Sequence, residues 1–157
     1  MTSLNTPKNT KTKIFLAEGT DAQAFLNEVF DACDVKDRSL RYGEYGKPYL
    51  VSSELFFNLS HCENMMTCAV SEREVGVDIQ KICYKPRVLK RVCSDKEADA
   101  IKTAEDFTRM WALKESFAKC DGRGLSYGFK DIDIKSLKNT EIWRYGDFLV
   151  AACYNED

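Results

Sequence analysis

Residues 55–81 decide the fold, and they read LFFNLSHCENMMTCAVSEREVGVDIQK. Apolar side chains alternate with other residues in three runs: Leu55, Phe57, Leu59; Met66, Cys68, Val70; and Val75, Val77, Ile79. A period of two is typical of a β-strand with one buried face. Because short polar segments at 61–64 and 71–74 separate the runs, the pattern predicts three strands in an antiparallel meander.

A strand and a helix are predicted before this stretch. Residues 13–17 favour a strand, and Thr20 with Gln23 three residues later favours a capping box at the start of a helix. Apolar residues then recur at helical spacing, at Ala22, Phe25, Leu26, Val29, Phe30 and Cys33. Residues 34–48 are charged and contain glycine, so we expect a loop there, with one helical turn at 38–42.

Helices and then further strands are predicted after it. Ser94 and Glu97 form a capping box that opens a short helix through Ile101. A longer helix is expected over 105–120, ending at Gly122, where a left-handed cap residue fits. Residues 129–134 alternate like a strand, and 141–145 and 148–154 flank a Gly-Asp turn as a hairpin.

This order of elements predicts an α+β fold with antiparallel sheets. We expect a disordered tail over residues 1–11 and a single domain over 12–157, built from two similar halves at about 12–83 and 84–157. A chain of 157 residues buries roughly 70% of its unfolded surface, enough for one core.

Composition excludes several classes of protein. The net charge of −2 argues against non-specific nucleic-acid binding, and the longest apolar run, 148–153, is too short to span a membrane. The polar N-terminus does not resemble a signal peptide. Seven cysteines without a C-x-x-C pair, and one histidine, argue against a zinc site. We expect reduced thiols in a cytoplasmic protein without nucleic-acid or membrane partners.

Two segments place acidic residues where chemistry is possible. Asp78 lies within an apolar strand, where a bare carboxylate needs a partner, unless it faces water on an open side of the sheet. In the helix WALKESFAK (111–119), Met110, Leu113 and Phe117 are expected to form the core stripe. Trp111, Glu115 and Lys119 would share the adjacent face, with Lys114 at its edge. Alternatively, Glu115 and Lys119 form only a surface pair worth about 0.3–0.5 kcal/mol.

Five motifs become informative when they are taken together. In order, the chain carries GKPY (46–49), FNLSH (57–61), GVDIQ (76–80), W-x-x-KESF-x-K (111–119) and G-x-GLS (122–126). Over about residues 41–135 this pattern resembles the 4′-phosphopantetheinyl transferase superfamily, in particular its pseudo-dimeric, surfactin-synthetase-activating type. The resemblance implies two pseudo-symmetric α+β halves with the active site between them. It also implies Mg²⁺-dependent transfer of phosphopantetheine from coenzyme A to a serine of an acyl or peptidyl carrier protein.

The resemblance also assigns roles to residues. Asp78 and Glu115 would bind Mg²⁺, and Glu115 would be the general base. Many relatives have an acidic residue where this chain has Gln80, whose amide oxygen would take that place at the metal. The coenzyme A contacts implied are Lys114 and Lys119 on phosphates, Ser60 and His61 on phosphate oxygens, and Lys47 and Pro48 at the adenine end.

The partners follow from the same resemblance. Arg38 and Arg41 are candidates for the 3′-phosphate of coenzyme A by charge and position. The basic stretch 84–91 would suit an acidic carrier protein, although it is equally well a solvated connector. Two halves in one chain favour a monomer. The alternatives are a catalytically weak or inactive coenzyme A-binding relative, motivated by Gln80, and an unrelated α+β interaction protein.

Overall fold

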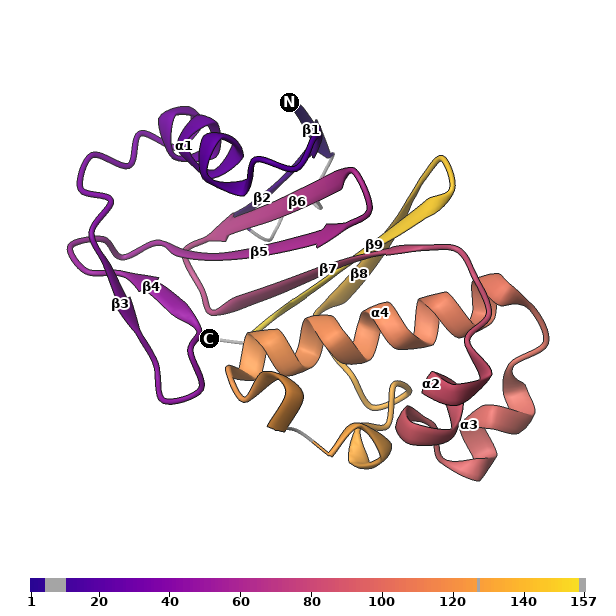
Figure 1. The fold of residues 1–157 in the computed structure, drawn as a ribbon. Coiled ribbons are helices and arrows are strands. Elements are labelled where there is room, and N and C mark those ends of the chain that lie inside the picture. Colours follow the sequence, from indigo (N-terminus) through magenta and orange to yellow (C-terminus); the bar gives the residue numbers. More distant parts are fainter. Residues whose placement is uncertain (5–10, 127, 156–157) are drawn as a thin grey trace.

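A computed structural model describes residues 1–4, 11–126 and 128–155, and it places the strands in three antiparallel sheets (Figure 1). The first sheet has the order β1-β2-β6-β5, formed by Thr2–Leu4, Thr12–Glu18, Met65–Ser71 and Phe56–Cys62. The second is a hairpin of β3 (Leu40–Tyr42) and β4 (Pro48–Leu50). The third has the order β7-β9-β8, formed by Val75–Lys81, Phe148–Tyr154 and Thr140–Tyr145.

Each of the two larger sheets is covered by one main helix. Helix α1 (Ala22–Ala32) packs on the first sheet, and α4 (Ala104–Asp121) lies along β7 and β9 (Figure 1). Four short helical segments surround α4: α2 (Pro86–Val92), α3 (Asp95–Ala100), η1 (Gly124–Ser126) and η2 (Phe129–Asp131). No helix in the described ranges is both long and apolar enough for a membrane span.

The two larger sheets repeat one topology. In the first, β2 precedes a helix and a hairpin, and the sheet order is β2-β6-β5. In the other, β7, α4, β8 and β9 give β7-β9-β8, so that in both cases the first strand pairs with the last one. The predicted α+β fold with antiparallel sheets is confirmed. Sheet pairing separates the halves between Ser71 and Val75, whereas the expected boundary at residue 83 leaves β7 in the first half.

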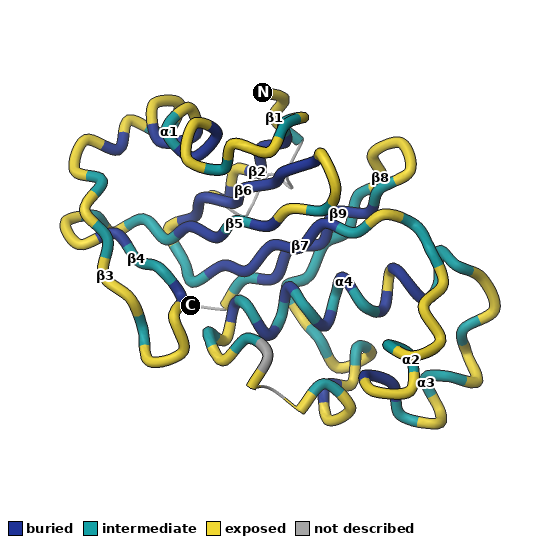
Figure 2. The backbone as a smooth tube through the Cα atoms, in the orientation of Figure 1, coloured by how far each residue is buried: buried dark blue, intermediate teal, exposed yellow. Residues whose placement is uncertain are grey.

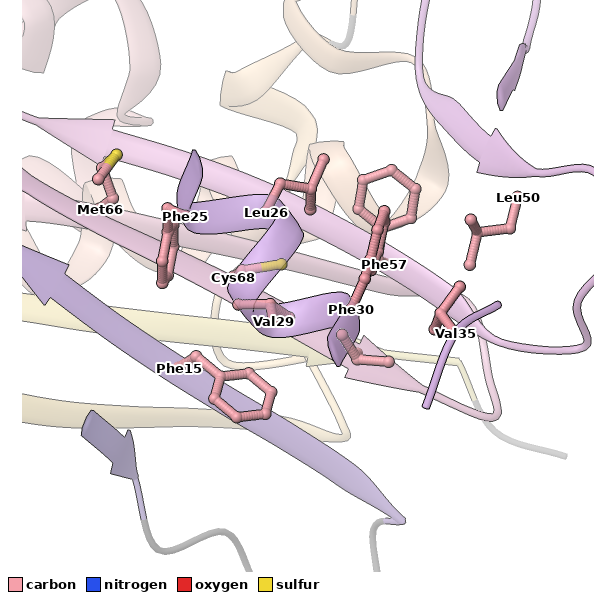
Figure 3. Close-up of a cluster of buried hydrophobic side chains, with 11 residues drawn as sticks. Phe15, Phe25, Leu26, Val29, Phe30, Val35, Leu50, Phe57, Met66 and Cys68 are labelled. Atoms are coloured by element: carbon pink, nitrogen blue, oxygen red, sulfur yellow. The ribbon is translucent and has the colours of Figure 1, made fainter. Parts of the chain in front are cut away.

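The core of the first half matches the predicted helix face. Phe25, Leu26, Val29 and Phe30 of α1 are buried against the sheet, and the rings of Phe30 and Phe57 meet edge to face at 5.1 Å (Figure 3). The predicted capping box was wrong, because the N-cap is Asp21, whose side chain accepts a hydrogen bond from the backbone of Ala24.

Two predicted elements and one predicted strand pairing were wrong. Residues 38–42 contain strand β3 instead of a helical turn, since Leu40 pairs with Leu50 across the hairpin. Residues 129–134 contain the single turn η2 instead of a strand. The meander stops after β6, because β7 pairs with β9. Period two predicts a strand but does not select its partner.

Several predicted helix ends are confirmed. The Ser94–Glu97 capping box begins α3, and α4 ends at Gly122, which is left-handed with φ 89°. The sequence pattern missed α2 and also missed β1, which lies within the expected tail and pairs with β2. Residues 5–10 of that tail lie outside the described part. The seven cysteines are free thiols in the structure.

Candidate functional site

The close contact between α4 and β7 forms the floor of the candidate site. A Cβ atom on Gly76 would lie 2.1 Å from the carbonyl oxygen of Ser116 and 2.3 Å from the backbone nitrogen of Cys120. The helix therefore rests directly on the strand, with Ala112, Ser116 and Cys120 buried. The predicted core stripe was wrong in part: Met110 is buried, but Leu113 and Phe117 are only half-buried. Side chains of that size do not fit at this helix–strand contact.

Asp78 lies at the centre of the site, under α4. Its side chain is 2% exposed, so it does not face water on an open side of the sheet. Oδ1 accepts hydrogen bonds from Lys119 Nζ at 2.7 Å and Ser60 Oγ at 2.9 Å. Oδ2 accepts one from Gln80 Nε2 at 2.9 Å. The carboxylate thus has the partners that burial requires.

Side chains of β5 join the two halves at this point. Asn58 Oδ1 accepts the backbone N–H of Val77 at 2.8 Å, and Ser60 Oγ accepts that of Ile79 at 3.4 Å. Lys119 Nζ also donates to Ser60 Oγ, at 2.8 Å. Strands β5 and β7, which belong to different sheets, therefore run side by side (Figure 1). Ser60 is held in the site by this junction.

Glu115 shares this region with Asp78. Burial, and to a smaller extent the negative charge of Asp78, raises the pKa of the Glu115 carboxyl to about 7. The positive charge of Lys119 opposes both effects. Two carboxylates that repel each other, with one ammonium that contacts Asp78, form a site short of positive charge. Strand β7 and helix α4 thus bring Asp78 and Glu115 close enough to interact electrostatically.

The donor set fits a magnesium ion bound by two carboxylates. Mg²⁺ prefers oxygen ligands and is commonly held by one or two carboxylates together with substrate phosphates. Within the described ranges, no group of three or more His, Cys, Asp or Glu residues is placed to hold a metal. Gln80 touches Asp78, so its side chain adjoins the same place, but it contributes no charge.

Lys114 is placed differently from its expected role. Its side chain is fully buried, and Nζ donates to Val92 O at 2.8 Å, Phe129 O at 2.8 Å and Glu97 Oε2 at 2.7 Å. An ammonium group has three hydrogens, so no donor remains for a phosphate. The expectation that Lys114 holds coenzyme A is therefore corrected: Lys114 ties α2, α3 and η2 to α4.

Lys47 is also turned into the protein. Its side chain is 5% exposed, and Nζ contacts Glu74 Oε2 at 2.5 Å, Cys120 O at 2.9 Å and Val75 O at 3.1 Å. These contacts fasten the β3–β4 hairpin to the end of α4 and the start of β7. The expected contact of this ammonium with the adenine end is therefore corrected, since its donors are used within the protein.

The remaining coenzyme A candidates lie nearer the surface. His61 is exposed near the end of β5, and Pro48 is half-buried at the start of β4. The Arg41 guanidinium lies 4.6 Å from the centre of the Tyr49 ring. Arg38 is engaged elsewhere, because it pairs with Asp31 and Asn27 of α1. Of the two arginines, Arg38 is thus the one that these contacts hold against α1.

The basic stretch forms most of α2. Lys85, Arg87, Lys90 and Arg91 are exposed, whereas Val88 and Leu89 pack inward against a small core that includes Phe107 and Met110. The exposed side chains of α2 are therefore mainly basic, and its apolar residues belong to the core.

The sequence interpretation missed two residues that position the site, Asn58 and Glu97. The signal for Asn58 was its position two residues before Ser60 in the same predicted strand, which places both polar side chains on one face. Glu97 was identified only as a member of a capping box, and the structure confirms that role. Its ion pair with Lys114 depends on tertiary structure, so the sequence pattern does not predict it.

Comparison with known proteins agrees with this geometry. A sequence model described as the 4′-phosphopantetheinyl transferase superfamily matches residues 74–155, slightly more than half of the chain. The chain therefore belongs to this superfamily. The match covers β7, α4 and the β8–β9 hairpin, and so includes Asp78 and Glu115.

Individual relatives carry the same name. A 4′-phosphopantetheinyl transferase of Bacillus subtilis is 33% identical over 102 residues, covering 59% of this chain and 45% of the relative. The transferase Sfp of Bacillus subtilis strain 168 is 32% identical over 119 residues, covering 69% and 52%. The rat L-aminoadipate-semialdehyde dehydrogenase-phosphopantetheinyl transferase is 33% identical over 110 residues, covering 56% and 36%. The chain spans about half the length of the curated relatives it matches.

Proposed function

We propose that this protein transfers 4′-phosphopantetheine from coenzyme A to a serine of an apo acyl or peptidyl carrier protein, releasing 3′,5′-ADP, with Mg²⁺ as cofactor. The observation that carries the proposal is the convergence of Asp78 on β7 and Glu115 on α4, beside Lys119. The names of the relatives support the same reaction.

The reaction assigns a role to each residue of the pair. The carrier serine Oγ attacks the β-phosphorus of coenzyme A, and the bond to the 3′,5′-ADP oxygen breaks. Glu115 takes the serine proton, as suits a carboxyl whose pKa burial raises toward neutrality. Asp78 and Glu115 would hold Mg²⁺, which supplies positive charge against the pyrophosphate when it is bound.

Cations and hydroxyls around the pair would orient the substrate. Lys119 is 25% exposed at its side chain, so its ammonium reaches both Asp78 and the open side of the site, where it would bind phosphate oxygens. Ser60 and His61 would contact the phosphates from the end of β5. Pro48 and Arg41, on the β3–β4 hairpin, would lie at the nucleotide end.

A direct assay tests the proposal. Mixing the protein with coenzyme A, Mg²⁺ and an apo carrier protein should add one phosphopantetheine group to the carrier, detected by intact mass. Glu115→Gln should remove transfer and leave coenzyme A binding in place. Glu28→Gln, at an exposed position of α1, is the matched control and should transfer like the wild type. Transfer that survives in Glu115→Gln contradicts the role of the base.

A second function is favoured by one observation. Gln80 replaces a charge with an amide directly against Asp78, which weakens the attraction for a divalent cation. The protein would then be a catalytically weak or inactive relative that binds coenzyme A. Calorimetric binding of coenzyme A without transfer, to several carrier proteins and at high Mg²⁺, selects this alternative.

We also propose a cytoplasmic monomer. Seven free cysteines suit a reducing compartment. The two halves that would form the site lie in one chain, so no second copy is needed to complete it. A single species of about the mass of one chain in light scattering supports this, and a concentration-dependent dimer contradicts it.

A further inference from the structure

A cavity of about 360 Å³ lies apart from the Asp78–Glu115 region. Its walls come from α3, the first turns of α4 and residues 130–135. Its volume lies in the range that holds small molecules in proteins. Neither Asp78, Glu115 nor Lys119 lines it, so the cavity is separate from the candidate site.

The inner wall of the cavity is apolar. Ile101, Met110 and Ile134 line it, and all three belong to, or pack against, the small core under α2 and α3. Met110 is buried at 2% exposure, while Ile101 and Ile134 are half-buried. The exposed parts of the two isoleucines form an apolar surface that an aliphatic ligand group would cover. Burial of such surface is worth about 25 cal/mol per Å².

The rim of the cavity carries three lysines. Lys96, Lys130 and Lys135 line it and are exposed. None of the three forms an ion pair with any residue that the structure describes. Arg109 adds a fourth cation, which pairs with Glu105 at 3.7 Å and also interacts electrostatically with Asp106.

The acidic residues of the lining each accept at least one hydrogen bond, although Glu97 Oε1 is buried without a partner among the described residues. Glu97 Oε2 accepts from Lys114 Nζ, and Asp106 accepts the backbone N–H groups of Thr103 and Lys102 at 2.9 and 3.1 Å. Asp133 Oδ1 accepts the backbone N–H of Lys135 at 3.0 Å. Hydrogen bonding holds these carboxylates in place at helix caps and turns, whereas the three rim lysines have no ion pair among the described residues that would keep them from a ligand.

We propose that this cavity binds a small amphipathic anion, a free carboxylate with an aliphatic tail, with the tail against Ile101, Met110 and Ile134 and the carboxylate among the rim lysines. The proposal is independent of the proposed transferase function, because it assigns a second site and is tested by binding alone. An acidic partner protein inserting an apolar side chain is the competing occupant, and the test separates it.

The test uses octanoate, octanamide and acetate on the full chain. Calorimetry should show saturable binding of octanoate that is several-fold tighter than that of the neutral amide, and no binding of acetate, since the tail and the charge both contribute. The backbone resonances of Ile101, Met110 and Ile134 should shift with octanoate. Equal binding of octanoate and octanamide, or shifts elsewhere, would overturn the proposal.

Two variants make the assignment specific. Lys130→Glu with Lys135→Glu should weaken octanoate roughly fivefold or more, because attraction at the rim becomes repulsion. Lys36→Glu, at an exposed lysine in the loop after α1, should not. Ala100→Trp, at an exposed position of the lining, should block binding by filling the cavity. Octanoate affinity unchanged in the double variant, or weakened equally in Lys36→Glu, contradicts the site. So does the absence of any saturable octanoate binding, which would leave the rim to a protein partner.

Discussion

The Asp78 carboxylate shows how much of the site depends on single contacts. It is nearly fully buried, and three side chains from β5, β7 and α4 satisfy its two oxygens. Each partner removes part of the cost of burying a charge, and only Lys119 supplies an opposite one. A second carboxyl, Glu115, lies close enough for Asp78 to raise its pKa. The two carboxylates outnumber the one ammonium group, and this charge balance favours the binding of a cation.

Gln80→Glu is predicted to lower the Mg²⁺ concentration needed for transfer by several-fold. The new carboxylate would lie where Gln80 Nε2 now donates to Asp78, and it adds a negative charge next to the proposed metal ligands. Without Mg²⁺ the variant should melt at a lower temperature than the wild type, because like charges repel. Gln80→Leu is the control that removes the hydrogen bond without adding charge. An unchanged Mg²⁺ requirement in Gln80→Glu would place residue 80 outside the metal site.

Lys114→Met is predicted to destabilise the protein by about 3–5 kcal/mol, because it leaves Glu97 buried without its counter-charge. Chemical denaturation measures the loss. The double variant Lys114→Met with Glu97→Gln should recover much of the loss, since it removes both charges. A stable single variant with unchanged coenzyme A affinity would show that the buried ion pair contributes little.

Acid stability should depend on the same pair. Burial raises the pKa of Glu97, but hydrogen bonds from Lys114 and the Ser94 backbone outweigh it, and the net pKa is lowered. A lowered folded-state pKa contributes stability that is present above the unfolded value of about 4.5 and is lost as pH falls through the folded value. Glu97→Gln should therefore flatten the fall of unfolding free energy below pH 4.5. An identical slope in both proteins would exclude Glu97 as a contributor.

At the scale of elements, the sequence predicts strands and helices better than their partners. The apolar face of α1, the β8–β9 hairpin and the end of α4 at Gly122 follow from local rules of spacing, turns and caps, and all are found. The partner of β7 does not follow from them, because an alternating strand fits any neighbour that covers its apolar face. The buried positions of Lys47 and Lys114 were equally invisible, since their acceptors are backbone carbonyls and carboxylates from distant segments.

Gly76→Ala is predicted to destabilise the protein by at least about 1–3 kcal/mol, the usual cost of overpacking a core. Its Cβ would overlap the Ser116 carbonyl and the Cys120 backbone, which forces α4 away from β7. Transfer should fall more than coenzyme A binding, because Glu115 and Lys119 move with α4. Gly146→Ala, with φ 56° and no neighbour within 4 Å, is the control that adds only backbone strain of about 1 kcal/mol. Equal losses in the two variants would argue against the close helix–strand contact.

At the scale of the whole molecule, two sheets of the same topology meet along β5 and β7, and the site lies on that line (Figure 1). Buried backbone runs through β6, β7 and β9 on both sides of it, whereas α2 and α3 are largely exposed (Figure 2). The junction depends on Asn58 and Ser60, two polar side chains that reach backbone N–H groups of the other half. Lys114 makes a similar polar link farther from the junction. It precedes Glu115 in α4, and its ammonium binds the exposed segments α2 and α3. The buried contacts of Lys114 thus connect the surface of α2 and α3 to the helix that carries Glu115.

Arg87→Glu with Lys90→Glu is predicted to raise the KM for an acidic carrier protein by roughly tenfold while leaving that for coenzyme A unchanged, because both residues are exposed on α2, away from Asp78. The difference from wild type should shrink at high ionic strength, since salt screens exposed charges. Lys36→Glu, in the loop after α1, is the control for charge reversal elsewhere on the surface and should leave both constants unchanged. If the double variant and the control behave alike, α2 is a solvated connector and the carrier protein docks elsewhere. If both KM values rise together, the basic surface of α2 serves the nucleotide as well as the protein.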